Sequence, residues 1–133
     1  MSLAVVDASV LTAFYISDDP RRVAVSSRLA SGDALFAPAH IDAEVVSALR
    51  GVAKASRAVE RAAPRALTHL AGFPLRRMPL APLLARIWQL RANVTSYDAA
   101  YVALAEYLDC ALVTCDAKLA SACGPRCAIE LIA

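Results

Sequence analysis

Four acidic residues stand where their carboxylates can do chemistry together. Asp7 and Asp116 each follow directly on a short apolar run, whereas Glu44 and Asp98 lie near the starts of segments with helical spacing. Two carboxylates about 4 Å apart repel each other by about 4 kcal/mol at an effective dielectric constant of about 20. Four carboxylates that converge therefore need protons or a cation between them. This pattern predicts a divalent metal site.

The chemical composition of this set favours a hard cation. It offers only carboxylate oxygens, because no His or Cys follows the same pattern. Oxygen donors suit Mg²⁺ or Mn²⁺ better than zinc, and Mg²⁺ retains several waters. We therefore expect Mg²⁺ or Mn²⁺ as the cofactor, with a substrate phosphate completing its coordination.

Each acid also has a structural alternative. Asp7, Asp42 and Asp116 stand where helix N-caps are expected, since a carboxylate there accepts from free backbone N–H groups. The segment 95–98, Thr-Ser-Tyr-Asp, has the form of a capping box. Only the joint placement of the acids favours a metal site over independent caps.

The segments that must position these acids alternate between strands and helices. Such alternation predicts a three-layer α/β fold, in which a parallel sheet is covered by helices on both faces and binds ligands at the carboxyl ends of its strands. Apolar runs predict strands at 3–6, 34–37, 75–80, 111–114 and 128–132. Helical spacing predicts helices at 8–16, 20–31, 82–91, 97–108 and 118–121, with two or three more between 40 and 63, broken near Gly51 and by Pro64.

Length and composition indicate one globular domain spanning 1–133. The 14 basic and 12 acidic residues give a net charge of +2, which is too small to indicate a nucleic-acid binder by bulk charge. No apolar run approaches the ~18 residues of a membrane span, and no signal peptide is evident, so we expect a cytoplasmic protein. Four cysteines between 110 and 127 are expected as free thiols, with a zinc site or a Cys123–Cys127 disulfide as alternatives.

Four short segments surround the acids: VVDAS at 5–9, IDAEV at 41–45, YDAAYVALAE at 97–106 and LVTCD at 112–116. These segments resemble PIN-domain proteins and, more narrowly, the VapC toxins of VapBC toxin–antitoxin systems. The similarity runs over nearly the whole chain in the family's order. One departure is Cys115, because relatives often carry a larger, basic residue there.

The resemblance implies a metal-dependent endoribonuclease toxin with a parallel sheet in the order 3-2-1-4-5. It implies RNA of the tRNA or rRNA class as substrate, a VapB-like antitoxin as partner, and a homodimer or toxin–antitoxin hetero-oligomer. We place part of the partner surface on the apolar helical residues from Val45 to Val59. The family's acid set falls on Asp7, Glu44, Asp98 and Asp116, and its hydroxyl positions, which would orient the carboxylates, fall on Ser9 and Thr114.

RNA or partner contacts are expected from basic and aromatic side chains. His40, four residues before Glu44, and Tyr97, beside Asp98, are candidates for substrate contact, with a helix-end histidine and core packing as the alternatives. A basic stripe spaced by three and four positions would line one face of a continuous helix, with a solvated face as the alternative: Arg50, Lys54, Arg57 and Arg61.

Other classes of protein compete with this interpretation. A phosphoacceptor receiver domain has a similar length, but it needs an acidic pair at the end of its first strand and a Lys after its fifth. Asp18 and Asp19 come too late, and Lys118 follows the wrong strand. A catalytically silent PIN scaffold that serves as an interaction module would normally have lost an acid. A PIN nuclease outside a toxin–antitoxin pair is a further alternative.

Overall fold

The computed structural model describes residues 2–133, which form a parallel sheet flanked by helices. The strand order is β3-β2-β1-β4-β5, which confirms the predicted topology. Central β1 is apolar on both faces because helices cover both faces. The strands are β1 (Leu3–Val6), β2 (Ala34–Pro38), β3 (Leu75–Met78), β4 (Ala111–Thr114) and β5 (Ile129–Leu131).

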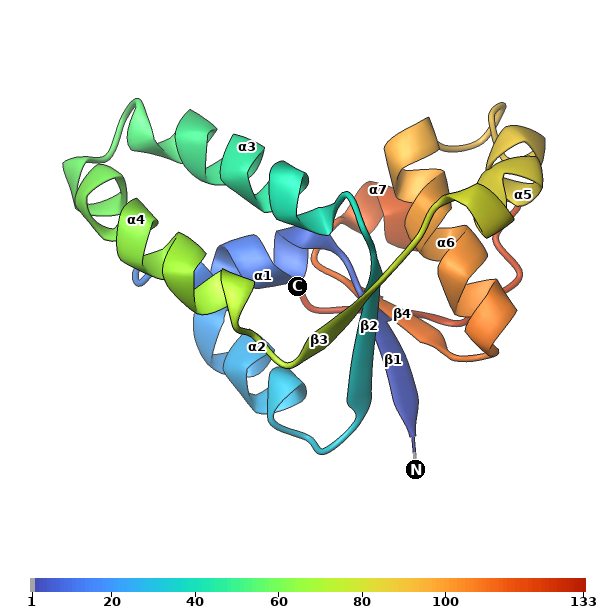
Figure 1. The fold of residues 1–133 in the computed structure, drawn as a ribbon, viewed down its shortest axis with the longest axis horizontal. Helices are drawn as coiled ribbons and strands as arrows, with labels where there is room; N and C mark the ends of the chain where they lie inside the picture. The colour runs from blue at the N-terminus through green and yellow to red at the C-terminus, as the bar shows by residue number, and fades with distance from the viewer. Residues whose placement is uncertain (1) are drawn as a thin grey trace.

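The helices form two layers on opposite sides of the sheet (Figure 1). On one side lie α1 (Ala8–Tyr15), α2 (Arg22–Leu29), α3 (Ile41–Ala53) and α4 (Arg57–Ala71). On the other lie a 3₁₀ turn (Ala81–Leu83), α5 (Leu84–Gln89) and α6 (Ser96–Leu108), while α7 (Ala117–Ala120) packs on β4 and β5. No helix among residues 2–133 combines the length and apolar character needed to cross a bilayer.

Helix α6 is buried through its central turns. Every residue from Ala99 to Ala105 is buried, and the helix packs on β1, β2 and β4. Four of these seven residues are alanine, so the helix axis can approach the sheet closely. This close packing fixes the start of α6, where Asp98 lies, against the carboxyl end of the sheet.

Of the two predicted helix breaks, the one near Gly51 lies a few residues later than expected, and the one at Pro64 is wrong. Gly51 lies inside α3, and Pro64 lies inside α4. The break instead falls at 54–56, where Ser56 caps α4 by accepting a hydrogen bond from the Val59 N–H. Pro64 is tolerated because it is exposed, so the backbone carbonyl that loses its N–H partner faces water.

Arg77 joins β3 to α3 and to the end of α4. Its guanidinium donates to the backbone oxygens of Leu70, Phe73 and Leu75. It also makes a bidentate pair with Asp42, at 3.0 and 3.1 Å. These bonds explain how an edge strand accommodates an arginine that points back toward the helices.

Arg77→Ala should lower the free energy of unfolding by about 2–3 kcal/mol, because several acceptors lose a charged donor at once. Urea denaturation of the purified protein measures this. The control is Arg76→Ala, because Arg76 is exposed and only stacks over Phe36. We expect that control to lose less than about 1 kcal/mol. Equal losses for the two variants would contradict the assignment.

Candidate functional site

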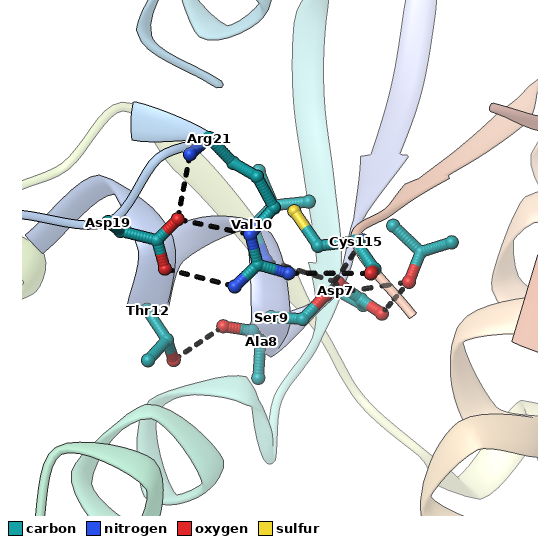
Figure 2. Close-up of polar contacts among 9 residues, drawn as sticks. Asp7, Ala8, Ser9, Val10, Thr12, Asp19, Arg21 and Cys115 are labelled. Carbon is teal, nitrogen blue, oxygen red and sulfur yellow. Dashed lines mark hydrogen bonds and ion pairs between the residues drawn. The ribbon is translucent and has the colours of Figure 1, made fainter. Parts of the chain in front are cut away.

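Asp7 is the most buried of the four acids, with a relative exposure of 5%. It follows β1 and caps α1, because its Oδ1 accepts from the Val10 N–H at 3.3 Å. Ser9 Oγ donates to the same oxygen at 2.5 Å, as Figure 2 shows. Thr114 Oγ1 donates to the other oxygen, Oδ2, also at 2.5 Å. Both carboxylate oxygens are therefore held in place.

Two backbone N–H groups orient the hydroxyls that hold Asp7. The Cys115 N–H donates to Ser9 Oγ at 2.9 Å, and the Asp116 N–H donates to Thr114 Oγ1 at 3.0 Å. Because each hydroxyl oxygen accepts one of these bonds, its own hydrogen is directed at Asp7. The ends of β1 and β4 are joined in this way, and the sequence segments VVDAS and LVTCD meet around one carboxylate.

The acids influence one another electrostatically. Burial raises the pKa of Asp7 to about 6, although the hydrogen bonds from Ser9 and Thr114 oppose this effect. Burial also raises the pKa of Asp98, and the neighbouring charges of Asp116 and Glu44 add to that rise. Folding has thus gathered like charges that destabilise one another without a cation.

Glu44 is held through one of its two carboxylate oxygens. The hydroxyl of the buried Tyr101 donates to Oε1 at 2.5 Å, and His40 Nε2 lies 3.2 Å from the same atom. Burial acts to raise the pKa of Glu44, but these two contacts outweigh it and lower the pKa. Among residues 2–133, no hydrogen bond or ion pair engages Oε2, so that oxygen is free to bind water or a cation.

His40 contacts Glu44 and packs beside two tyrosine rings. Its Nε2 lies 3.2 Å from two acceptors, the backbone oxygen of Tyr97 and Glu44 Oε1, so we place the ring proton on Nε2. Its ring lies 5.0 Å from Tyr101 and 5.9 Å from Tyr97. Tyr97 itself is 66% exposed, so the core-packing alternative for this residue is wrong.

Tyr101→Phe should weaken Mn²⁺ binding about tenfold, because Glu44 loses the hydroxyl that orients it. Phenylalanine retains the buried ring, so the circular dichroism spectrum and the melting temperature should change little. Calorimetric titration of Mn²⁺ measures the affinity. Tyr107→Phe, on an exposed residue of the same helix, is the matched control. An unchanged affinity in Tyr101→Phe would show that this contact does not position Glu44.

Two of the acids, Asp7 and Asp116, also serve as helix caps. Asp7 caps α1, and Asp116 caps α7 by accepting from the Lys118 N–H at 2.9 Å. At the start of α6 the cap is Thr95, which accepts from the Asp98 N–H at 3.2 Å. The structural and chemical interpretations of Asp7 and Asp116 are therefore compatible. Asp42 differs, because it lies within α3 and pairs with Arg77 instead of capping a helix.

The oxygen donors of this site suit a hard divalent cation. One buried and three partly exposed carboxylates, which repel one another, are oxygen ligands of the kind that such a cation prefers. Among residues 2–133, no three Asp, Glu, His or Cys side chains are close enough together to hold a metal ion by themselves. Mg²⁺ is commonly held through one or two carboxylates with water in its remaining positions, which is a coordination that this set allows.

The predicted basic stripe is divided between two helices. Arg50 and Lys54 lie at the end of α3, whereas Arg57 and Arg61 begin α4 after the turn at 54–56. The four residues are exposed, as the solvated-face alternative requires. A continuous stripe on one helix is therefore wrong, because the chain reverses direction between its two halves.

Arg21 lies beside the site and was not predicted from the sequence. Asp19 holds its guanidinium by two bonds of 2.9 and 3.0 Å, and Arg21 Nη1 reaches the Cys115 backbone oxygen at 3.5 Å (Figure 2). The signal in the sequence is only an acid and an arginine two positions apart. Their position next to β4 depends on the packing of the loop between α1 and α2.

All four cysteines are free thiols, so the Cys123–Cys127 disulfide is wrong. Cys115, next to Thr114, is buried, and burial raises the pKa of its thiol. A protonated thiol is a poor nucleophile. Cys115, the position where we expected a larger basic residue, is therefore a small buried side chain at the rim of the site.

Comparison with known protein families decides the assignment. The family model described as PIN domain matches residues 4–125, which include all four acids. The chain belongs to the PIN-domain family. It is 38% identical to ribonuclease VapC9 of Mycobacterium tuberculosis over 130 residues, which are 98% of each protein. It is also 38% identical to ribonuclease VapC12 of the same organism over 131 residues, 98% of this chain and 100% of VapC12.

Solved structures share the fold. The crystal structure of PAE2754 from Pyrobaculum aerophilum superposes with a TM-score of 0.69 at 27% identity, covering 97% of this PIN domain and 83% of that chain. The crystal structure of M. tuberculosis VapC20 gives a TM-score of 0.70 at 18% identity, covering 87% of this chain and 92% of VapC20. The present chain is thus a PIN-domain protein of the VapC ribonuclease family.

Proposed function

We propose that this PIN-domain protein is an endoribonuclease that uses Mg²⁺ or Mn²⁺, with Asp7 as the central ligand. Asp98 and Asp116 are its neighbours, and Glu44 contributes through water. The observation that carries this proposal is the buried Asp7 carboxylate, whose two oxygens are held by Ser9 and Thr114 at the carboxyl edge of the sheet.

The side chains of this site prepare it for phosphodiester hydrolysis. Ser9 and Thr114 fix the orientation of Asp7 before substrate arrives, and Tyr101 and His40 fix that of Glu44. Preorganised groups avoid the cost of reorientation during the reaction. When bound, the divalent ion supplies Lewis-acid stabilisation of the phosphate oxygens and lowers the pKa of water. The ring of Tyr97, which is exposed, is our candidate for stacking on an RNA base.

RNA cleavage tests the proposal. A labelled single-stranded RNA is incubated with the protein in Mg²⁺, Mn²⁺ or EDTA, and the products are resolved by electrophoresis. We expect cleavage only with metal, and a loss of about 1,000-fold in Asp98→Asn, which corresponds to about 4 kcal/mol of transition-state stabilisation. Asp18→Asn, an exposed acid outside the site, should cleave normally. Equal rates for Asp98→Asn and the wild type would overturn the proposal.

We propose a VapB-like antitoxin as the partner of this toxin. The crystal structure of VapBC2 from Rickettsia felis bound to a promoter DNA fragment has the same fold, with a TM-score of 0.66 at 15% identity. Within the stretch from Val45 to Val59 expected to meet the partner, Val45 and Val59 are buried in the core, whereas Val46 and Val52 are exposed and remain available for contact. A groove of about 660 Å³ is a further candidate for the partner, since aromatic and basic side chains line it: Phe14, Tyr15, Arg22, Arg61 and Arg65. An antitoxin segment with apolar and acidic residues would complement this groove.

We further propose that residues 1–133 are a single PIN domain that acts in the cytoplasm on RNA of the tRNA or rRNA class. VapC20, one of the structural relatives, is described as a toxin that cleaves the sarcin–ricin loop. The assembly we propose is a homodimer or a toxin–antitoxin hetero-oligomer. Exposed apolar side chains such as Leu84 and Trp88 on α5 are available for such contacts.

A further inference from the structure

A cavity of about 430 Å³ opens beside two of the four acids. One wall carries the carboxylates of Asp98 and Asp116. The remaining walls come from the segment that precedes α6 and from α7 with the turn after it. The lining includes Arg91, Asn93, Lys118 and Ala122. This volume lies in the range of pockets that hold small organic groups.

Two polar side chains in this cavity have no bonding partner among residues 2–133. No hydrogen bond or ion pair engages the side-chain amide of Asn93 or the ammonium of Lys118. Arg91 differs, since its guanidinium stacks over Trp88 at 4.2 Å and donates to the Trp88 backbone oxygen. The cavity therefore presents one neutral amide and one cation that are free to bind a ligand.

The position of the Asn93 side chain is constrained by the chain that follows α7. Gly124 has a φ of +102°, and an added Cβ there would lie 3.2 Å from Asn93 Cγ. The missing Cβ lets the loop pack directly against the amide. Asn93 is therefore backed by protein on one side and faces the cavity on the other.

We propose that this cavity binds the nucleoside that flanks the cleaved phosphodiester, with Asn93 on the base edge and Lys118 on the neighbouring phosphate. The inference rests on the proposed function, because the cleaved phosphate would lie at Asp98 and Asp116. A nucleoside joined to that phosphate would then lie next to the adjoining cavity. An amide offers both a donor and an acceptor to a base edge, and an ammonium suits a phosphate.

Steady-state cleavage of short RNAs that vary at the positions flanking the cleavage site tests the subsite. Lys118→Ala should raise KM about tenfold with kcat nearly unchanged, because a charged contact to phosphate is lost from bound substrate. Asn93→Ala should remove the base preference at one flanking position. Ala92→Trp should block the cavity from an exposed position that needs no core rearrangement. Arg126→Ala, which removes an exposed cation elsewhere, is the control for general electrostatic attraction.

Binding measured without turnover separates this inference from the proposed function. Fluorescence anisotropy of a labelled single-stranded RNA in EDTA should show weaker binding for Lys118→Ala and Ala92→Trp than for Arg126→Ala. If Asp98→Asn loses cleavage while the three cavity variants bind and cleave like the wild type, the subsite is wrong and the nuclease assignment stands. If the wild type does not cleave RNA, the proposed function is wrong and the cavity is no cleavage subsite; the anisotropy comparison then shows only whether the cavity binds RNA.

Discussion

Asp7→Asn is expected to abolish RNA cleavage and to stabilise the metal-free protein at neutral pH. Cleavage should fall by about 1,000-fold, because the central ligand is lost. Stability should rise because burial raises the pKa of the Asp7 carboxyl from 3.8 to about 6, so its ionisation opposes folding. A shift of about two units corresponds to about 3 kcal/mol. The amide makes poorer bonds with Ser9 and Thr114, so we expect a net gain of about 1–2 kcal/mol.

The pH dependence of this gain has a defined sign. Because the folded pKa of Asp7 is raised, its favourable contribution is present below pH ~4 and is lost as the pH rises through ~6. Melting temperatures in EDTA at pH 7.5 and at pH 4 measure the difference between Asp7→Asn and the wild type. The variant should melt higher at pH 7.5 and lose that advantage at pH 4. An advantage of the same size at both values would contradict the burial argument.

Thr114→Val is expected to weaken both Mn²⁺ binding and RNA cleavage by about 10–100-fold. Valine has nearly the same shape, and Thr114 is fully buried, so packing is preserved. The substitution removes the donor to Asp7 Oδ2 and leaves the Asp116 N–H without its acceptor. One side chain thus orients two of the proposed ligands.

The matched control for this change is Thr12→Val, in the helix that follows Asp7. Thr12 Oγ1 donates to the Ala8 backbone oxygen and contacts none of the acids (Figure 2). Calorimetry with Mn²⁺ and the RNA cleavage assay are applied to both variants. Similar behaviour of Thr114→Val and Thr12→Val would mean that the hydroxyl at 114 is only a strand-end group.

Local sequence signals were sufficient to predict the sheet. The runs 3–6 and 111–114 are apolar at every position except the final Thr114, as expected for strands covered on both faces. The family resemblance supplied the strand order. Helix boundaries in the middle of the chain were predicted less well. Proline inside an exposed helix costs less than the breaker rule assumes, so Pro64 misled the prediction while Ser56 marked the true start.

The supporting contacts of the site could not be predicted, because they join residues that are distant in the sequence. Tyr101 meets Glu44 across 57 positions, and Arg21 meets Cys115 across 94. Neither pairing leaves a spacing signal, since each depends on how α6 and the loop after α1 pack on the sheet. The same holds for Lys118, which lines the same cavity as Asp98 only because the fold brings α7 and the start of α6 to one end of the sheet.

Direct titration of Mn²⁺ into the purified protein at pH 7.5 tests the central claim, that folding gathers these four acids around a shared dication. Calorimetry should detect binding to the wild type and to Asp18→Asn. Binding should be at least about tenfold weaker in each of Glu44→Gln, Asp98→Asn and Asp116→Asn. The account would be contradicted if the wild type took up no Mn²⁺, or if Glu44→Gln, Asp98→Asn and Asp116→Asn all bound Mn²⁺ as tightly as the wild type.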